Sequence, residues 1–330
     1  TKETYLLEIS ENNKKGIGEC AIFRGLSYDD VPDYEEKLTW LCKNINLDFE
    51  VLKKELLHYP SIIFGLEQAL LNLEHGEDLY FPSDFTDGKD SIKINGLIWM
   101  GNADFMQSQI EEKLAKGFDC IKLKIGVDWK SEKEIIKKLR EKFPKEQLEL
   151  RVDANGAFSY EEARMVLQEL ADLGIHSIEQ PIKKSEVRSP KSEENSEKKS
   201  TDCCVPWNEM AKLCAETPTP IALDEELIGV IDFEEKKKLL ETIKPQYIIL
   251  KPALVGGFSG SDEWIVLAES LGIDWWITSA LESNIGLNAI CQYTYTKKNP
   301  LPQGLGTGAL FTNNFETHLQ LEGDQMWHKK

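Results

Sequence analysis

The chain has 330 residues, of which 41% are hydrophobic, and it carries a formal net charge of −18 with a pI near 4.9. This is enough for a large buried core, in one large domain or in a large domain with a smaller companion. The negative charge would repel nucleic-acid phosphates and anionic bilayers, so we expect neither as a partner. No apolar run approaches the roughly 20 residues of a membrane span, and residues 1–10 lack the features of a signal peptide, which predicts a cytoplasmic protein.

The seven cysteines are scattered without CxxC spacing. This pattern is typical neither of a disulfide framework nor of a zinc site, so we expect reduced thiols. Thr1 is not a natural initiator, and a strand pattern begins at residue 4. We therefore expect the natural chain to start further upstream.

Residues 1–88 predict a small α+β unit. A strand over residues 4–9 is followed by a glycine-rich turn at 16–18, a second strand that ends near residue 21, and helical stretches that include 33–42 and 62–73. After residue 88, short apolar runs alternate with amphipathic helical segments, the pattern of repeated βα units around a parallel sheet.

Seven strands are predicted in this second part, with a weaker eighth near residues 301–305. They are residues 92–99, 120–125, 148–153, 175–179, 220–224, 247–251 and 274–279. The predicted helices between them are residues 105–116, 132–142, 160–173, 207–216, 233–243, 262–271 and 284–296. A closed α/β barrel is the most economical arrangement of these elements, and an open doubly wound sheet is the alternative.

Residues 183–201 interrupt the alternation. They are rich in Ser, Lys and Glu and almost free of apolar residues, so they cannot bury enough surface to order themselves. We interpret them as a surface insertion. The alternative is a lid or regulatory loop, because the segment closely follows the strand that ends at Glu179.

Charged residues recur where the predicted barrel strands end. The sequence Lys122-Leu123-Lys124 places two ammonium groups on the same face of one strand; by spacing alone, a half-exposed strand would explain it. The five charged residues at or next to the ends of five predicted strands are Lys124, Asp153, Glu179, Asp224 and Lys251. In a (β/α) barrel the catalytic residues lie at these ends, although a single acid there more often caps the following helix.

Three carboxylates on consecutive strands suit Mg²⁺, for which Mn²⁺ could substitute, whereas zinc would recruit His or Cys. Lysines that face such an ion suggest proton transfer next to a substrate carboxylate, where the metal stabilises an enediolate. Lys124 is the better candidate for the base because it lies nearer the strand end, with Lys122 as its electrostatic support. Lys251 would approach from the other side of the barrel.

These residues resemble the enolase superfamily, in its muconate-lactonizing-like branch. The residues that carry the resemblance are Lys122, Lys124, Asp153, Asn155, Glu179, Gln180, Pro181, Asp224, Glu225 and Lys251. The resemblance spans nearly the whole chain and implies a (β/α)7β catalytic barrel over 89–310 with an N-terminal capping domain over 1–88. Residues 22–28 correspond to the loop that closes over the substrate, and we expect residues 311–330 to pack back on the capping domain.

Within that branch, residues 251–257, 279–286 and 304–311 resemble the o-succinylbenzoate synthase family of lyases. Dipeptide epimerases of the branch carry an Asp-x-Asp motif near the last strand, which is missing from residues 301–314. The resemblance implies a syn dehydration in menaquinone biosynthesis, with Lys124 as acid and base, Lys251 as electrostatic stabiliser, and Asp153, Glu179 and Asp224 as ligands of Mg²⁺.

Other residues have weaker claims. Ser279, Ser283 and Gly306 are candidates for binding the succinyl end of the substrate. Arg151 shares the inward face of Asp153 and would bind a substrate carboxylate or form an ion pair inside the barrel. Three further residues, Asn155, Gln180 and Glu225, would orient the ligands, although loop hydrogen bonds or helix caps would explain them as well.

Two other functions fit the same residues. An N-succinylamino acid racemase would use the same metal site, with Lys124 and Lys251 as opposed bases. A barrel without catalytic activity that binds an acidic ligand is the alternative of another class. The expected partner in each case is a small carboxylate, and the oligomeric state is left open.

Overall fold

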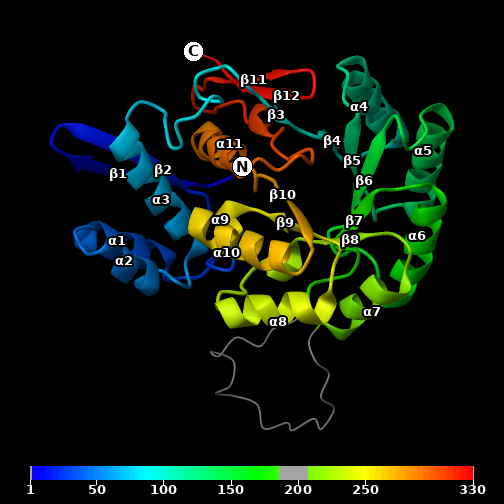
Figure 1. The fold of residues 1–330 in the computed structure, drawn as a ribbon, viewed down its shortest axis with the longest axis horizontal. Helices are drawn as coiled ribbons and strands as arrows, with labels where there is room; N and C mark the ends of the chain where they lie inside the picture. Colours follow the sequence, from blue (N-terminus) through cyan, green and yellow to red (C-terminus); the bar gives the residue numbers. More distant parts are fainter. Residues whose placement is uncertain (1, 186–206, 330) are drawn as a thin grey trace, which may run out of the picture.

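The structure is a computed structural model in which residues 2–185 and 207–329 are described. Its centre is a curved parallel sheet of seven strands in the order β10-β9-β8-β7-β6-β5-β4 (Figure 1). The strands are β4 (Gly96–Ile98), β5 (Cys120–Lys124), β6 (Glu149–Asp153), β7 (Ser177–Glu179), β8 (Ile221–Leu223), β9 (Tyr247–Leu250) and β10 (Asp274–Ile277).

Helices follow these strands in the chain, as the alternating sequence pattern predicted. They are α4 (Ala103–Ala115), α5 (Trp129–Lys142), α6 (Tyr160–Asp172), α7 (Asn208–Glu216), α8 (Phe233–Ile243), α9 (Pro252–Val255), α10 (Gly257–Ser270) and α11 (Asn284–Lys297). In α6, for example, Ala163, Val166, Leu167 and Leu170 are buried at three-four spacing. Ser159 and Glu162 form a capping box at its start.

Residues 303 and 304 close the ring between β10 and the start of β4. Gln303 forms a parallel bridge with Ile94, and Gly304 forms one with Thr278. The Gly304 N–H donates to the Ile277 carbonyl at 2.8 Å, and the Asn95 N–H donates to the Gln303 carbonyl at 2.9 Å. The predicted (β/α)7β barrel is therefore confirmed. The weak eighth strand near residues 301–305 consists of only these two bridges. The alternative, an open doubly wound sheet, is wrong.

The predicted strand at 92–99 is divided in the structure. Its first part, β3 (Ile92–Lys93), pairs with the C-terminal strand β12 (Gln325–His328), and its second part, β4, pairs with β5. The Ile94 N–H donates to the Asp324 carbonyl, whereas the next N–H, of Asn95, turns to Gln303. One apolar run thus serves two sheets, because the backbone changes its partner in the middle.

The N-terminal unit contains β1 (Tyr5–Glu11) and β2 (Lys14–Cys20), which are antiparallel, followed by α1 (Tyr34–Asn44), α2 (Phe49–Glu55) and α3 (Pro60–His75). Strand β2 packs very closely on α3. A Cβ atom added at Gly18 would lie only 1.9 Å from the Gly65 carbonyl oxygen. Glycine is therefore needed at the contact that holds the two-stranded sheet against its helix.

The C-terminal strands β11 (Leu319–Glu322) and β12 form a hairpin that extends β3 into a three-stranded sheet. His318 and His328 of this hairpin contact Asp78, which follows α3. The hairpin therefore contacts both sides of the predicted boundary at residue 88, and the domain limits stay a prediction. Within the described ranges, no helix has the length and apolar character needed to cross a membrane. The predicted insertion at 183–201 lies outside the described residues from 186 onward.

A buried carboxylate joins α3 to the barrel. Glu67 accepts hydrogen bonds from the backbone N–H groups of Phe258, at 2.5 Å, and Ser259, at 3.2 Å, in the first turn of α10. Burial raises the pKa of Glu67 to about 7, although the hydrogen bonds from Ser259 and Phe258 act in the opposite direction. The ring of Phe64 packs edge-on against Phe258 at the same place, at 5.4 Å between centroids.

The raised pKa of Glu67 predicts a pH dependence of stability. Because the folded protein holds this proton more tightly than the unfolded chain, the contribution of Glu67 is full at low pH and is lost as the pH rises from about 4.5 toward about 7. Between pH 5 and pH 8 the wild type should lose up to about 3 kcal/mol through this group. Glu67→Gln should lack that loss, as measured by urea unfolding at both pH values.

Glu74→Gln provides the control, because Glu74 is exposed on the same helix. This variant should keep the pH dependence of the wild type. The same slope in Glu67→Gln as in the wild type would contradict the assignment of the effect to Glu67.

Candidate active site

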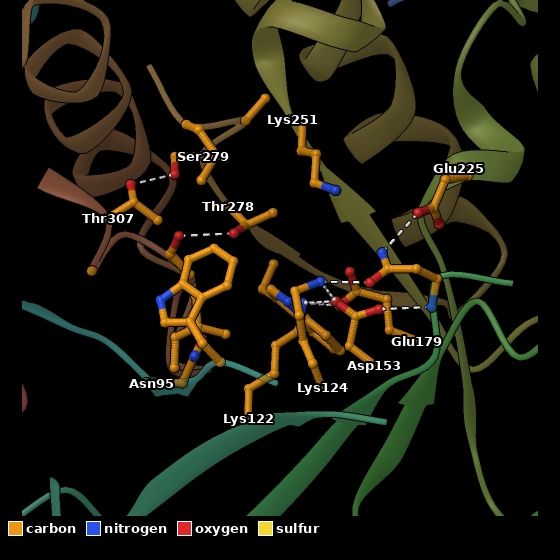
Figure 2. A pocket seen from close by; sticks show the side chains of 18 of the residues that line it. Asn95, Lys122, Lys124, Asp153, Glu179, Glu225, Lys251, Thr278, Ser279 and Thr307 are labelled. Atoms are coloured by element: carbon orange, nitrogen blue, oxygen red, sulfur yellow. Dashed lines mark hydrogen bonds and ion pairs between the residues drawn. The ribbon is translucent and has the colours of Figure 1, made fainter. Parts of the chain in front are cut away.

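The strand register brings the predicted site residues to one level of the barrel. Lys124 pairs with Asp153 in the β5–β6 ladder, and Asp153 pairs with Glu179 in the β6–β7 ladder. Side chains of laterally paired residues lie on the same face of a sheet, so all three point into the barrel, with Lys122 two residues earlier on the same face. Figure 2 shows this group, with Lys251 approaching from β9.

Oppositely charged groups are in direct contact across these strands. The Lys122 ammonium lies 3.0 Å from Asp153 Oδ2 and also donates to Glu179 Oε2. The Lys124 ammonium donates to the same Asp153 oxygen at 3.0 Å. On the other side, Lys251 donates to Asp224 Oδ2. The sequence prediction that these charges converge is therefore met by four ion contacts.

Because these carboxylates are buried, the pKa of each one depends strongly on the charges of its neighbours. The residues Asp153, Glu179 and Asp224 are each no more than 2% exposed. Burial would raise the pKa of Asp153, but Lys122, Lys124 and Lys251 outweigh it and hold that pKa well below its usual range. For Glu179, burial comes first and repulsion from Asp153 adds to it, so its pKa is raised despite the lysines.

Burial and ion pairing also act against each other on the pKa values of two of the lysines, Lys122 and Lys251. Burial alone would lower the pKa of Lys122, but the attraction of Asp153 and Glu179 raises it above the usual value. The pKa of Lys251 is raised in the same way, against burial, mainly by Asp224. Both lysines are thus charged partners of the carboxylates. The raised pKa of Glu179 indicates that an additional positive charge nearby would stabilise the ionised form of this carboxylate.

The donors present fit a hard divalent cation. Asp153, Glu179 and Asp224 offer only carboxylate oxygens, the ligands that Mg²⁺ prefers. Glu179 Oε1 is buried and has no hydrogen-bond partner among the described residues, so a strong acceptor is left over. Among the described residues these three carboxylates do not form a set of donors within 4.8 Å of one another. Each of them instead contacts a lysine ammonium group.

Two of the predicted orienting residues connect the charged groups to neighbouring loops. Asn155 accepts from Lys124 at 2.5 Å and donates to Glu225 Oε1 at 2.9 Å. It has a φ of 44°, in the left-handed region that asparagine tolerates. Gln180 accepts from the backbone N–H of Asp224 at 3.3 Å. These contacts fix the lysine on one side and the loop that carries Asp224 on the other.

A cavity of about 290 Å³ opens at this end of the barrel. The residues that line it are Phe23, Leu26, Asn95, Leu97, Trp99, Lys122, Lys124, Asp153, Asn155, Glu179, Glu225, Lys251, Trp276, Thr278, Ser279, Ala280, Leu281, Gly304, Gly306 and Thr307. Of the predicted substrate-binding residues, Ser279 and Gly306 are in this set. Asp224 is not, and it contacts the cavity's Lys251 instead.

Polar groups face the lysines across this cavity. Ser279 and Thr307 share a hydrogen bond of 2.5 Å between their hydroxyl groups (Figure 2). Asn95 Oδ1 is buried and has no hydrogen-bond partner within the described ranges. The cavity therefore combines lysines and carboxylates, several of them paired, with uncharged donors and acceptors, which suits a small polar molecule.

Two residues proposed from the sequence lie elsewhere. Arg151 donates to Glu149 at 2.7 Å and to the Pro302 carbonyl at 2.9 Å, deep in the barrel, so the structure contains the alternative, an internal ion pair. The Ser283 hydroxyl donates to Glu19 of β2 at 2.5 Å and caps α11. Neither residue lines the cavity.

Several lining residues were not found from the sequence. Phe23 and Leu26 belong to the loop that the resemblance placed over the substrate, although neither was named. Trp99 carried no signal, because it does not follow a charged strand end. Thr307 belongs to the segment 304–311 that carries the resemblance, but it was not named as a site residue. Trp276 packs against Ala222 and Ile249 inside the barrel and also lines the cavity.

Comparisons with known proteins agree with this geometry. Residues 106–192 match the family described as "Enolase C-terminal domain-like". The chain is 41% identical to the o-succinylbenzoate synthase of Desulfotalea psychrophila, over 98% of this chain and 91% of that protein. A crystal structure of MenC from the same organism superimposes with a TM-score of 0.85 at 40% identity, covering 99% of this chain and 94% of that one. The N-succinylamino acid racemase of Thermus thermophilus is 33% identical, over 54% of this chain and 40% of its own length.

Proposed function

The chain belongs to the o-succinylbenzoate synthase family of lyases in the enolase superfamily, and from this membership we propose the reaction and the role of each residue. The reaction is the Mg²⁺-dependent syn dehydration of 2-succinyl-6-hydroxy-2,4-cyclohexadiene-1-carboxylate to o-succinylbenzoate, in cytoplasmic menaquinone biosynthesis. The observation that carries the proposal is the contact of Lys122 and Lys124 with the carboxylates of Asp153 on β6 and Glu179 on β7, at a cavity that Lys251 also lines.

Lys124 is the acid and base in this proposal. It removes the proton from the carbon that bears the carboxylate, and the bond from the neighbouring carbon to the hydroxyl group then breaks as the new ring double bond forms. The same ammonium group returns the proton to the departing hydroxyl, which leaves as water. One residue can perform both steps because the two leaving groups lie on one face in a syn elimination.

The contacts of Lys124 support this role. Asp153 and Asn155 fix its ammonium group, and Glu225 fixes Asn155 in turn. To act as a base, Lys124 must first give up its own proton. Lys122, whose ammonium group contacts the same Asp153 oxygen, is its electrostatic support in this proposal.

Lys251 stabilises negative charge that develops on the substrate carboxylate. It enters from β9, four places from β5 in the strand order, and therefore from across the barrel. Its raised pKa keeps it positively charged. A fixed cation in a site from which water is excluded stabilises developing charge more strongly than it would in water.

Asp153, Glu179 and Asp224 would hold the Mg²⁺ ion. When bound, the ion supplies a second positive charge for the substrate carboxylate. Lys122 would position the same carboxylate. Ser279 and Gly306, which line the cavity, would contact the succinyl end.

Removing divalent metal should abolish the reaction. Protein treated with EDTA should form the aromatic product, followed by ultraviolet absorption, at least about a hundredfold more slowly than protein with Mg²⁺, because the metal contributes several kcal/mol of charge stabilisation. Added Mg²⁺ should restore the rate. Equal rates with and without metal would exclude this cofactor, and no product with metal would exclude the substrate.

Replacing the proposed base should remove the chemistry and leave the fold intact. Lys124→Ala should lower kcat by about 10² to 10⁴, with an unchanged circular dichroism spectrum. Lys130→Ala is the matched control, because Lys130 is an exposed lysine on the helix that follows β5. Full activity in Lys124→Ala would contradict the mechanism, and binding of the substrate without turnover in the wild type would favour a non-catalytic barrel.

Racemisation of N-succinylamino acids is the second candidate, because Lys124 and Lys251 reach the cavity from opposite sides of the barrel. Two opposed lysines could exchange a proton on both faces of an α-carbon. If dehydration is the only activity, incubation with N-succinylamino acids in D₂O should give no α-deuteration. Rapid deuteration with loss of optical rotation would show that Lys251 also transfers protons.

A further inference from the structure

Three potential metal ligands lie together outside the barrel, where the C-terminal hairpin meets the segment that follows α3. Asp78 Oδ2 lies 2.6 Å from His318 Nδ1 and 3.2 Å from His328 Nε2. One donor atom from each residue lies within 4.8 Å of the other two. No sequence motif connects them, because more than 200 residues separate Asp78 from the two histidines.

Rigid elements hold these three side chains. The Lys329 N–H donates to the His318 carbonyl at 2.8 Å, next to the Leu319–His328 pair of the β11–β12 ladder, and the two imidazole rings lie 5.3 Å apart between centroids. The Asp78 carbonyl accepts from Asn288 and Gln292 of α11, at 2.9 and 2.8 Å. The ligands are therefore positioned before any ion binds, as an effective site requires.

The hydrogen bonds of this cluster are incomplete. His328 is fully buried, with its ring 5.8 Å from that of Phe85. His328 Nδ1 and Asp78 Oδ1 are both buried without a hydrogen-bond partner among the described residues. The Asp78 and His318 side chains are 29% and 43% exposed, which leaves a path for an ion and space for a water ligand. A buried polar cluster with unused acceptors is unfavourable unless something else satisfies it.

We propose that Asp78, His318 and His328 bind one divalent transition-metal ion of the zinc type, with water as the fourth ligand. Two imidazole nitrogens and one carboxylate oxygen suit Zn²⁺ or Co²⁺ better than Mg²⁺. Ligand atoms around a tetrahedral zinc ion lie about 3.3 to 3.5 Å apart, so small side-chain shifts from the present distances would admit it. The bound ion would fasten the C-terminal hairpin to the end of α3.

This site differs in chemistry from the proposed Mg²⁺ site, and the two can be tested separately. Wild-type protein in excess Mg²⁺ should take up one Zn²⁺ per chain in competition with a chromophoric chelator, and its melting temperature should rise because the ion binds only the folded state. His318→Gln should weaken Zn²⁺ binding by at least about tenfold and should remove the rise in melting temperature. His318 is partly exposed, so this variant should keep the wild-type circular dichroism spectrum.

Three controls make the test decisive. His58→Gln should bind Zn²⁺ as the wild type does, because His58 is an exposed histidine outside the cluster. Asp78→Asn should weaken binding as His318→Gln does. Glu179→Gln should leave Zn²⁺ binding unchanged. Unchanged binding in His318→Gln, loss of binding in Glu179→Gln, or a thiolate charge-transfer band in the Co²⁺-loaded protein would each overturn the proposal.

Discussion

Pairing of buried opposite charges at one end of the barrel is the constraint on which the site depends. A lone carboxylate or ammonium group in this position would lose several kcal/mol of solvation. The parallel register removes that difficulty because it places Lys124, Asp153 and Glu179 at one level on neighbouring strands. Lys122, two residues earlier on β5, then pairs with Glu179, and Lys251, across the barrel, pairs with Asp224. The same pairing that makes the charges tolerable in the fold also brings together the groups to which the proposed mechanism assigns the binding of a carboxylate substrate.

The N-terminal unit completes this environment. Phe23 and Leu26 contribute apolar side chains to the cavity, and exclusion of water strengthens every charge interaction within it. Their loop is anchored by Asp29, which accepts from both the N–H and the hydroxyl of Ser61 at the start of α3. Glu67 attaches the same helix to the barrel. Through α3, the position of the loop over the cavity is linked to the packing of the two units.

The sequence predicted the barrel and its charged strand ends because those features are local: apolar alternation gives strands, and an acid or lysine at a strand end is visible without tertiary information. Features that depend on long-range contacts were not accessible. The division of residues 92–99 between two sheets requires the C-terminal hairpin. The contact of Ser283 with Glu19 requires the N-terminal sheet. The cluster of Asp78 with two histidines requires the C-terminal hairpin to contact the segment after α3, and no local sequence pattern predicts that contact.

Arg151 shows a further limit of reasoning from alternation. Its position two residues before Asp153 correctly gives the inward face, but the face does not give the depth. Two residues along a strand correspond to about 6.6 Å, which places Arg151 one layer below Asp153 and level with Lys122. There its guanidinium group lies 4.2 Å from the centre of the Trp276 ring and pairs with Glu149. Since Trp276 lines the cavity, Arg151 supports the cavity floor through that ring. Depth alone does not decide access to the cavity, because Lys122 pairs with Arg151 in the β5–β6 ladder and still lines the cavity. The contacts of the Arg151 side chain with Glu149 and Trp276 keep it out of the set of lining residues.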